Sequence, residues 1–385
     1  MHANRSEMTQ VYLVPGFFGF NEIGSLNYFN KVSEVLQDAL AERSLEAEVI
    51  ETGTLPAGSI RRRAVRLIDH VREHGGHAHE HLHFIGHSTG GLDVRMLLSP
   101  GVRLRDTHEE VEIGSRTRSA VTLSTPHHGT PLANFFTSMN GRNLLYLMTL
   151  LATSRPGRYG VYLSSRLLYT GVRLARVLGD QESRVDAFAE KVLKNLKPSR
   201  GDDLWDFVAQ VSRDQGAMVQ LTPESLDLFN GAVTDRPNVK YVSFVSASPP
   251  PDLRKFLRLR RHNLYEPFTH AVYALSYAIT SREHARYPYP PLGEADAARM
   301  AGSFPFELSP ATNDGVVPAL SQVWGELGGA VVGDHLDVVG QFQQSTRNNT
   351  SDTWVKSGSG FSEERFRSLW GDIASVIARA QGNPG

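Results

Sequence analysis

The sequence contains no cysteine among its 385 residues, so disulfide bonds, thiolate metal sites and cysteine nucleophiles are excluded. It also lacks a charge-free apolar run long enough to cross a bilayer. Residues 1–8 contain no apolar segment of the kind that a secretory signal needs. We therefore expect a soluble, cytoplasmic protein without a transmembrane segment. The mature form of a secreted protein given a new start would have the same sequence.

No charge excess and no repeat marks the chain. Its formal net charge is −1, which gives no bulk attraction to nucleic acid, and we expect no nucleic-acid partner. Hydrophobic residues make up 40% and charged residues 21%, as in a globular protein with a sizeable core. The length fits one large domain with an insertion as well as it fits two domains.

Short apolar runs alternate with amphipathic helical patterns in the first third of the chain. This alternation predicts a parallel sheet with helices on both faces. The apolar runs lie at 11–14, 48–51, 82–85 and 120–123, and the helical patterns at 28–43, 60–73 with Ser59 as N-cap, and 89–98.

The alternation stops in the middle of the chain. Residues 131–235 show helical patterns and no convincing strand, whereas strand signals return at 239–245 and 330–332. Further helices are expected near 270–279 and at 361–380. We therefore predict an α/β core from 1–130 and 236–385, with 131–235 as a helical lid or cap insertion.

The segment Gly86-His87-Ser88-Thr89-Gly90 has the pattern G-x-S-x-G. In this pattern the serine lies on a strained turn between a strand and a helix, where its hydroxyl is lifted clear of the sheet. The five residues alone are a weak signal, but an apolar run precedes them and a helical pattern follows. This context predicts Ser88 as a nucleophile.

A serine nucleophile needs a base, and the base needs an orienting carboxylate. In hydrolases with this turn the acid and then the histidine follow the serine in the chain. Asp314 lies at a glycine turn, and His335 follows an apolar run. We assign Asp314 as the orienting acid and His335 as the general base, although alone they resemble an ordinary turn former and a loop histidine.

Backbone N–H groups must stabilise the oxyanion of such a reaction. One is expected from Thr89, the residue after the nucleophile. The second is expected from Phe17, in a glycine-rich loop that follows the first apolar run. Phe18 and Phe20 in the same loop are candidates to line an acyl pocket.

Two other features have competing interpretations. The histidines between His74 and His83 could bind a metal, but we interpret them as part of a solvated loop, with His81 and His83 facing outward from the next strand. The patterns at 143–151 and 160–178 have wide apolar faces. They could form a mobile lid that makes transient contact with a lipid interface, or a cap packed permanently on the core.

Several separate stretches resemble the bacterial lipases of the Pseudomonas and Burkholderia type, which have the α/β-hydrolase fold. The resemblance fades at 140–235 and 250–305. Pro15 stands where that family usually has a histidine, and the pair of cysteines found in many members is absent. The similar stretches are Gly16 to Asn21 with Tyr28-Phe29, Ile85 to Gly91, Thr125 to Thr130, Asn313 to Val317, and His335 to Asp337.

The resemblance implies an α/β-hydrolase fold with a Ser88, Asp314 and His335 triad. It also implies a structural calcium ion held by Asp337 and Gln341, with a second acidic ligand upstream. Glu294 and Asp296 both lie in the right region. No cofactor for catalysis is implied.

The expected activity is hydrolysis of a carboxylic ester through an acyl-enzyme, with triacylglycerol or another lipid ester as substrate. The rival activities are those of an esterase, a polyester depolymerase or an acyltransferase with the same triad. A catalytically silent scaffold or binding protein of this fold is the alternative from another class. The sequence leaves open the acyl length, the alcohol part and the oligomeric state.

Overall fold

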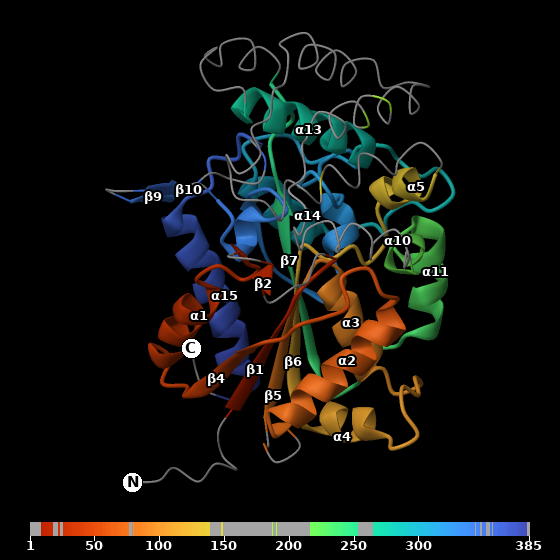
Figure 1. Cartoon of the computed structure of the whole chain (residues 1–385), viewed down its shortest axis with the longest axis vertical. Helices are drawn as coiled ribbons and strands as arrows, with labels where there is room; N and C mark the ends of the chain where they lie inside the picture. Colours follow the sequence, from red (N-terminus) through yellow and green to blue (C-terminus); the bar gives the residue numbers. More distant parts are fainter. Residues whose placement is uncertain are drawn as a thin grey trace, which may run out of the picture.

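The centre of the protein is a six-stranded parallel sheet with strand order β4-β1-β5-β6-β7-β8 (Figure 1). The computed structural model describes residues 9–17, 22–23, 26–76, 79, 81–138, 148, 187, 190, 216–252, 265–342, 344–346, 349–351, 355 and 357–382. The strands of the sheet are β1 (Thr9–Val14), β4 (Ala47–Glu51), β5 (Leu82–His87), β6 (Thr117–Leu123), β7 (Lys240–Ala247) and β8 (Glu326–Val332).

Helices cover both faces of the sheet and the space beyond its carboxyl edge (Figure 1). The described helices are α1 (Val32–Ala41), α2 (Ile60–Glu73), α3 (Thr89–Leu98), α4 (Glu109–Arg116), α5 (Pro131–Thr137), α10 (Gly216–Gln220), α11 (Pro223–Ala232), α13 (Tyr265–Thr280), α14 (Glu294–Ser303) and α15 (Glu363–Ala380). Smaller elements are the hairpins β2 (Glu22–Ile23)–β3 (Leu26–Asn27) and β9 (Gln344–Thr346)–β10 (Asn349–Ser351), and the 3-10 turns η3 (Ala319–Gln322) and η4 (Asp337–Val339).

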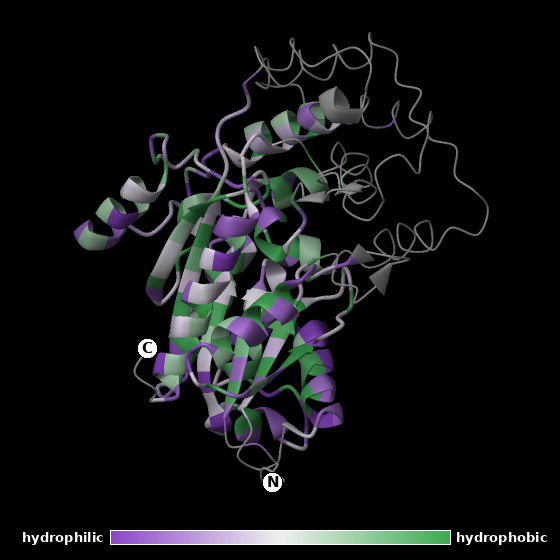
Figure 2. Cartoon of the chain, turned by 90° about the vertical axis from the view of Figure 1, so that its left-hand side faces the viewer, coloured by the Kyte–Doolittle hydropathy of each residue, from purple (hydrophilic) through white to green (hydrophobic). Residues whose placement is uncertain are grey.

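The alternation of side chains along β1 divides the core into two layers. Val11 and Leu13 pack in the cluster that contains the apolar faces of α1 and α15. Tyr12 and Val14 point the other way, into the cluster formed with α2 and α3. Both faces are buried, so the central strands are rich in apolar residues, which appear green in Figure 2, and the polar residues among them are buried as well.

The predicted strands and main helices are confirmed, and α2 illustrates why. Ser59 precedes it, and the Ser59 side chain accepts a hydrogen bond from the Arg62 N–H. The expected apolar face of this helix is buried, from Ile60 to Val71. Local capping and a helical period were therefore sufficient to place this element.

Several elements were not predicted: α4, α14 and the two hairpins. Strand β8 begins at Glu326, upstream of the apolar run at 330–332. Its first half contains Gly328 and Gly329, which hide the strand signal. A Cβ atom at Gly328 would lie 2.6 Å from the ring of Phe244 on the neighbouring strand, so the glycine makes room for that ring.

His83 does not face outward from its strand, so that expectation is wrong. It is fully buried in β5, and its Nδ1 is 2.7 Å from the Ser119 hydroxyl on β6. The reason is that β5 is a central strand covered on both faces. Side chains that alternate along it are therefore buried on either face. Burial, with smaller contributions from His81 and Arg118, lowers the pKa of His83 to about 3.

The described residues of the predicted insertion include the helices α5, α10 and α11. The segments 143–151 and 160–178 lie outside the described residues, apart from Met148, as do Phe18 and Phe20. The domain boundaries therefore stay predictions. Among the described helices, none combines the length and the apolar character that spanning a bilayer requires.

Candidate active site

Ser88 lies on a sharp turn between β5 and α3 at the carboxyl edge of the sheet. Its backbone has φ 54° and ψ −130°, a conformation that a side-chain-bearing residue rarely adopts. The flanking glycines permit this turn. A Cβ at Gly86 would lie 2.4 Å from the Gly91 nitrogen, and one at Gly90 would lie 2.2 Å from the Val14 carbonyl oxygen. The spacing of the motif therefore reflects close backbone packing around the serine.

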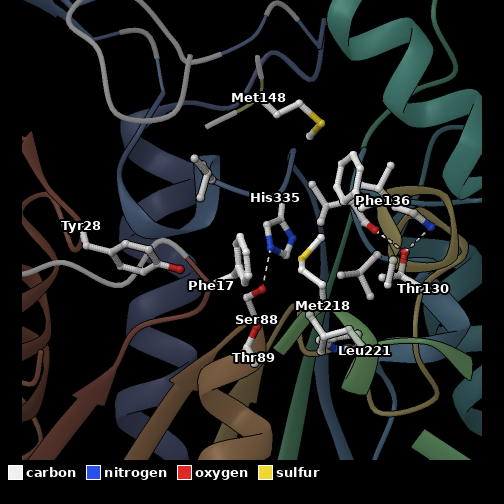
Figure 3. A pocket seen from close by; sticks show the side chains of 16 residues that line it. Phe17, Tyr28, Ser88, Thr89, Thr130, Phe136, Met148, Met218, Leu221 and His335 are labelled. Carbon is white, nitrogen blue, oxygen red and sulfur yellow. Dashed lines mark hydrogen bonds between the residues drawn. The ribbon is translucent and has the colours of Figure 1, made fainter. Parts of the chain in front are cut away.

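Ser88, His335 and Asp314 form a hydrogen-bonded row. His335 Nε2 is 2.9 Å from Ser88 Oγ (Figure 3), and His335 Nδ1 is 2.7 Å from Asp314 Oδ2. A carboxylate can only accept a hydrogen bond, so Nδ1 carries the imidazole proton and Nε2 faces the hydroxyl as an acceptor. Ser88 is 247 positions from His335 in the chain and Asp314 is 21 positions from it, and the fold places the three in the order that proton transfer needs.

The Asp314 carboxylate is completely buried and bonded on both oxygens. Its Oδ1 accepts from the N–H groups of Val316 and Val317, at 2.9 and 2.7 Å. Its Oδ2 accepts from the Ser246 hydroxyl at 3.0 Å and from the Gln322 amide at 3.3 Å. The acid lies in a turn beside the end of β7 rather than on a strand, and these bonds give it one orientation toward His335.

Phe17 and Thr89, the predicted oxyanion donors, flank Ser88. Thr89 is the first residue of α3, and Phe17 ends the described part of the loop after β1. The backbone between them is tight, because a Cβ at Gly16 would lie 2.6 Å from the Ser88 Cβ. The loop therefore approaches the nucleophile in a way that requires glycine.

Arg63 of α2 forms hydrogen bonds with the backbone of this loop. Its Nη2 donates to the carbonyls of Pro15 and Gly16, at 2.8 and 3.1 Å. In a trans peptide the N–H points opposite to the C=O. The Gly16 carbonyl is directed at Arg63, so the N–H of Phe17, in the same peptide unit, is directed away from Arg63. The side chain thus sets the orientation of a predicted oxyanion donor.

Arg63 is fully buried and paired with Asp93 of α3. The distance from Arg63 Nη2 to Asp93 Oδ2 is 2.8 Å, and Arg63 Nε also donates to this carboxylate. Burial raises the pKa of Asp93 to about 6, although the charge of Arg63 opposes this shift. Sequence reasoning missed Arg63, but a signal existed: it falls on the apolar face of α2, between Ile60 and Leu67.

An apolar cavity of about 60 Å³ opens beside Ser88 and His335 (Figure 3). Phe17 and Tyr28 lie on one side of the serine, and the other wall includes residues of α5, Met218 of α10 and residues of the neighbouring loops. A hydrogen-bonded serine at the mouth of a hydrocarbon-lined space can accept a substrate with one polar group and an apolar tail. The apolar wall consists of Pro126, Leu132, Ala133, Phe136, Met148, Met218, Leu221, Val316, Val317 and Leu336.

Asp337 and Gln341, the expected calcium ligands, have other partners. Asp337 is buried, and its Oδ2 accepts from the Asp334 N–H at 2.8 Å and the Ser359 hydroxyl at 2.7 Å. The Gln341 amide donates to the carbonyl of Asn27 at 2.7 Å. Calcium takes six to eight oxygens, and the described residues contain no group of three or more acidic or histidine side chains that could hold a metal. The contacts described for Asp337 and Gln341 do not by themselves supply a calcium coordination shell, and calcium binding stays a prediction from the resemblance.

Several solved structures are similar to this chain. The chain is similar to the lipase of Staphylococcus hyicus, with a TM-score of 0.52, 17% identity and 99% of each chain covered. It is similar to EstA from Clostridium botulinum, with a TM-score of 0.50, 19% identity, and coverage of 97% of this chain and 87% of that one. The fold is that of the α/β-hydrolases.

A third similar structure is lipase 1 from Pelosinus fermentans, with a TM-score of 0.51 and 16% identity over 97% of this chain and 99% of that one. No protein-family model matches the chain, and no curated protein matches it. The predicted fold class is confirmed. The narrower resemblance to the Pseudomonas and Burkholderia lipases stays a prediction.

Proposed function

We propose that the protein is a serine carboxylic ester hydrolase. One observation carries the proposal: Ser88, His335 and Asp314 form a hydrogen-bonded row at the mouth of an apolar cavity. Two of the similar structures are named as lipases and the third as EstA, and these names agree with the proposed activity. A catalytically silent scaffold protein would not require these three groups to be hydrogen-bonded to one another.

The proposed reaction has two halves. In the first, His335 Nε2 takes the Ser88 proton as Oγ attacks the ester carbonyl carbon, and the N–H groups of Phe17 and Thr89 bind the oxyanion. The imidazolium then gives its proton to the departing alcohol, which leaves an acyl group on Ser88. In the second half, water loses a proton to His335 and attacks the acyl carbon. The acid is released, and the proton returns to Ser88 Oγ.

Asp314 keeps the imidazole in the tautomer that this sequence needs and stabilises the imidazolium. It stays a carboxylate throughout. Its bonds to the N–H groups of Val316 and Val317 and to Ser246 hold the carboxylate still while the charge on His335 changes.

We propose lipid esters as substrates because the wall beside the serine is almost entirely hydrocarbon. An acyl chain buried there loses its contact with water, which contributes about 0.8 kcal/mol for each methylene group. A shorter-chain esterase would share the triad but gain nothing from this wall. Activity that rises with acyl length would therefore favour a lipase-like activity over that of a short-chain esterase.

The test is hydrolysis of p-nitrophenyl esters of rising acyl length by the wild type and by Ser88→Ala, with and without EDTA. We expect kcat of Ser88→Ala to fall roughly 10⁴-fold or more. Ser119→Ala is a matched control, because it removes a buried serine hydroxyl that bonds His83 and does not join the row. Retained activity in Ser88→Ala would refute the mechanism. If EDTA changes neither activity nor the unfolding temperature, the calcium prediction is wrong.

A further inference from the structure

A chain of hydrogen bonds runs behind the site and joins the loop at Gly16 to the loop that carries His335. The Gly16 N–H donates to the Tyr28 hydroxyl at 2.9 Å. The Tyr28 hydroxyl is 2.7 Å from His87 Nδ1, and His87 Nε2 is 2.9 Å from the carbonyl oxygen of His335. The segments at Gly16 and Tyr28, which are 12 residues apart, are thus connected to the distant segments at His87 and His335.

Each link in this chain has one direction. The His335 carbonyl can only accept, so Nε2 of His87 carries the imidazole proton and Nδ1 is the acceptor. The Tyr28 hydroxyl therefore donates to Nδ1, and its oxygen lone pair receives the Gly16 N–H. Burial lowers the pKa of His87 well below its ordinary value, with His335 adding to the effect, so the imidazole is neutral. Burial also raises the pKa of Tyr28, so its hydroxyl keeps its proton.

The two connected loops leave strands that are not neighbours in the sheet. The Gly16 loop follows β1, which pairs with β4 and β5, whereas His335 follows β8, which pairs with β7 at the far edge. No strand ladder fixes their separation directly. The carbonyl of His335 and the N–H of Gly16 are held instead by side chains that extend across the carboxyl edge.

We propose that Tyr28 and His87 are positioning residues for ester hydrolysis, which set the oxyanion loop at the correct distance from the catalytic histidine. This inference rests on the proposed function. Tyr28 lines the cavity, so a substituted Tyr28 could also act through the substrate. His87 is fully buried and not part of the cavity wall, and its ring centroid lies 4.8 Å from that of His335, so it can act on the catalytic groups without touching the substrate.

Three substitutions separate the links. Tyr28→Phe removes only the hydroxyl. His87→Asn places an amide oxygen near the former Nδ1 and loses the donor to His335, whereas His87→Gln can reach the His335 carbonyl with an amide N–H. Tyr12→Phe is the matched control, because it removes a buried tyrosine hydroxyl whose partner, Gln10, lies at the opposite edge of the sheet.

We expect Tyr28→Phe and His87→Asn each to lower kcat about tenfold, less than the loss of a whole oxyanion donor. KM should change by less than about twofold, because substrate binding does not need the aligned loops. His87→Gln should retain more activity than His87→Asn. The double variant Tyr28→Phe/His87→Asn should be little worse than the worse single variant, because both act through one chain. Tyr12→Phe should keep the wild-type kcat.

The assay is steady-state hydrolysis of a soluble ester, with thermal unfolding of every variant and fluorophosphonate labelling of wild-type Ser88. Single variants with wild-type kcat, a change in KM alone, or losses that multiply in the double variant would each overturn the inference. If His87→Asn does not fold, the split between kcat and KM in Tyr28→Phe still decides, because a lost substrate contact would raise KM whereas a displaced loop lowers kcat alone. A wild type that neither hydrolyses esters nor labels overturns the proposed function as well, whereas an active, labelled wild type confines the failure to this inference.

Discussion

Arg63 offers the sharpest separation of stability from catalysis. Its guanidinium bonds the carbonyls of Pro15 and Gly16 and forms a buried ion pair with Asp93. We consider Arg63→Met, which keeps the length of the apolar stem and removes the donors. The Gly16 peptide would then be free to rotate, and the Phe17 N–H would lose its fixed direction.

The expected loss of stability follows from burial. Arg63→Met leaves the Asp93 carboxylate buried without its partner, and breaking such a pair costs about 3–5 kcal/mol of unfolding free energy. Replacing both partners, as in Arg63→Met/Asp93→Leu, removes the stranded charge. Double hydrophobic replacements of buried pairs are often neutral or stabilising. The double variant should therefore recover most of the lost stability.

Catalysis should not recover with it. Neither methionine nor leucine can bond the carbonyls of the oxyanion loop, so we expect kcat of both variants to stay about 10- to 100-fold below wild type. Urea unfolding and steady-state ester hydrolysis, measured on the same preparations, test this. If the double variant recovers wild-type kcat together with its stability, Arg63 contributes only to folding and the orientation argument is wrong.

Two further predictions concern a buried histidine and the cavity wall. Since burial lowers the pKa of His83 to about 3, the unfolded chain binds a proton first as the pH falls below about 6.5. His83 therefore lowers the free energy of unfolding by about 1.4 kcal/mol per pH unit down to about pH 3. His83→Asn should reduce the slope of the unfolding free energy against pH by that amount in urea titrations between pH 6 and 4.5, whereas His108→Asn, at an exposed site, should leave the slope unchanged; equal slopes in both variants would contradict the assignment. Met218→Trp fills the cavity and should lower the ratio of long-chain to short-chain ester hydrolysis by about tenfold, whereas Val219→Trp, half-exposed on the same helix, should leave the ratio unchanged. A similar drop in both tryptophan variants would show that the wall at Met218 does not select acyl length.

The parts of the fold that the sequence predicts well are those with strong local signals. Helix α2 has its cap at Ser59 and an apolar face at helical spacing. The turn at Ser88 is encoded by glycines that must be where they are because backbone atoms approach within 3 Å of any added Cβ. Such constraints act over a few residues, so a reader of the sequence can recognise them.

The parts that it predicts poorly depend on neighbours distant in the chain. Strand β8 looks unlike a strand because its glycines accommodate Phe244 of β7. The alternation of residues around His83 predicts that its side chain faces outward, but both faces of the sheet are covered at β5 and His83 is buried. The contacts of Asp337 and Gln341 likewise depend on Ser359 and Asn27, which no spacing near the histidine could indicate.

The polar residues that sequence reasoning missed share one physical task. Loops at the carboxyl edge of a parallel sheet have left the strand ladder, so their backbone groups need other partners. Arg63 bonds the carbonyls of one such loop, and His87 bonds the carbonyl of His335 in another. In the sequence each of these residues is only a polar residue in an apolar setting, an exception to the pattern that predicts the core. Because burying such groups is costly unless they are bonded, each exception marks a place where the fold uses a side chain to fix a loop, and here those loops carry the groups proposed to react.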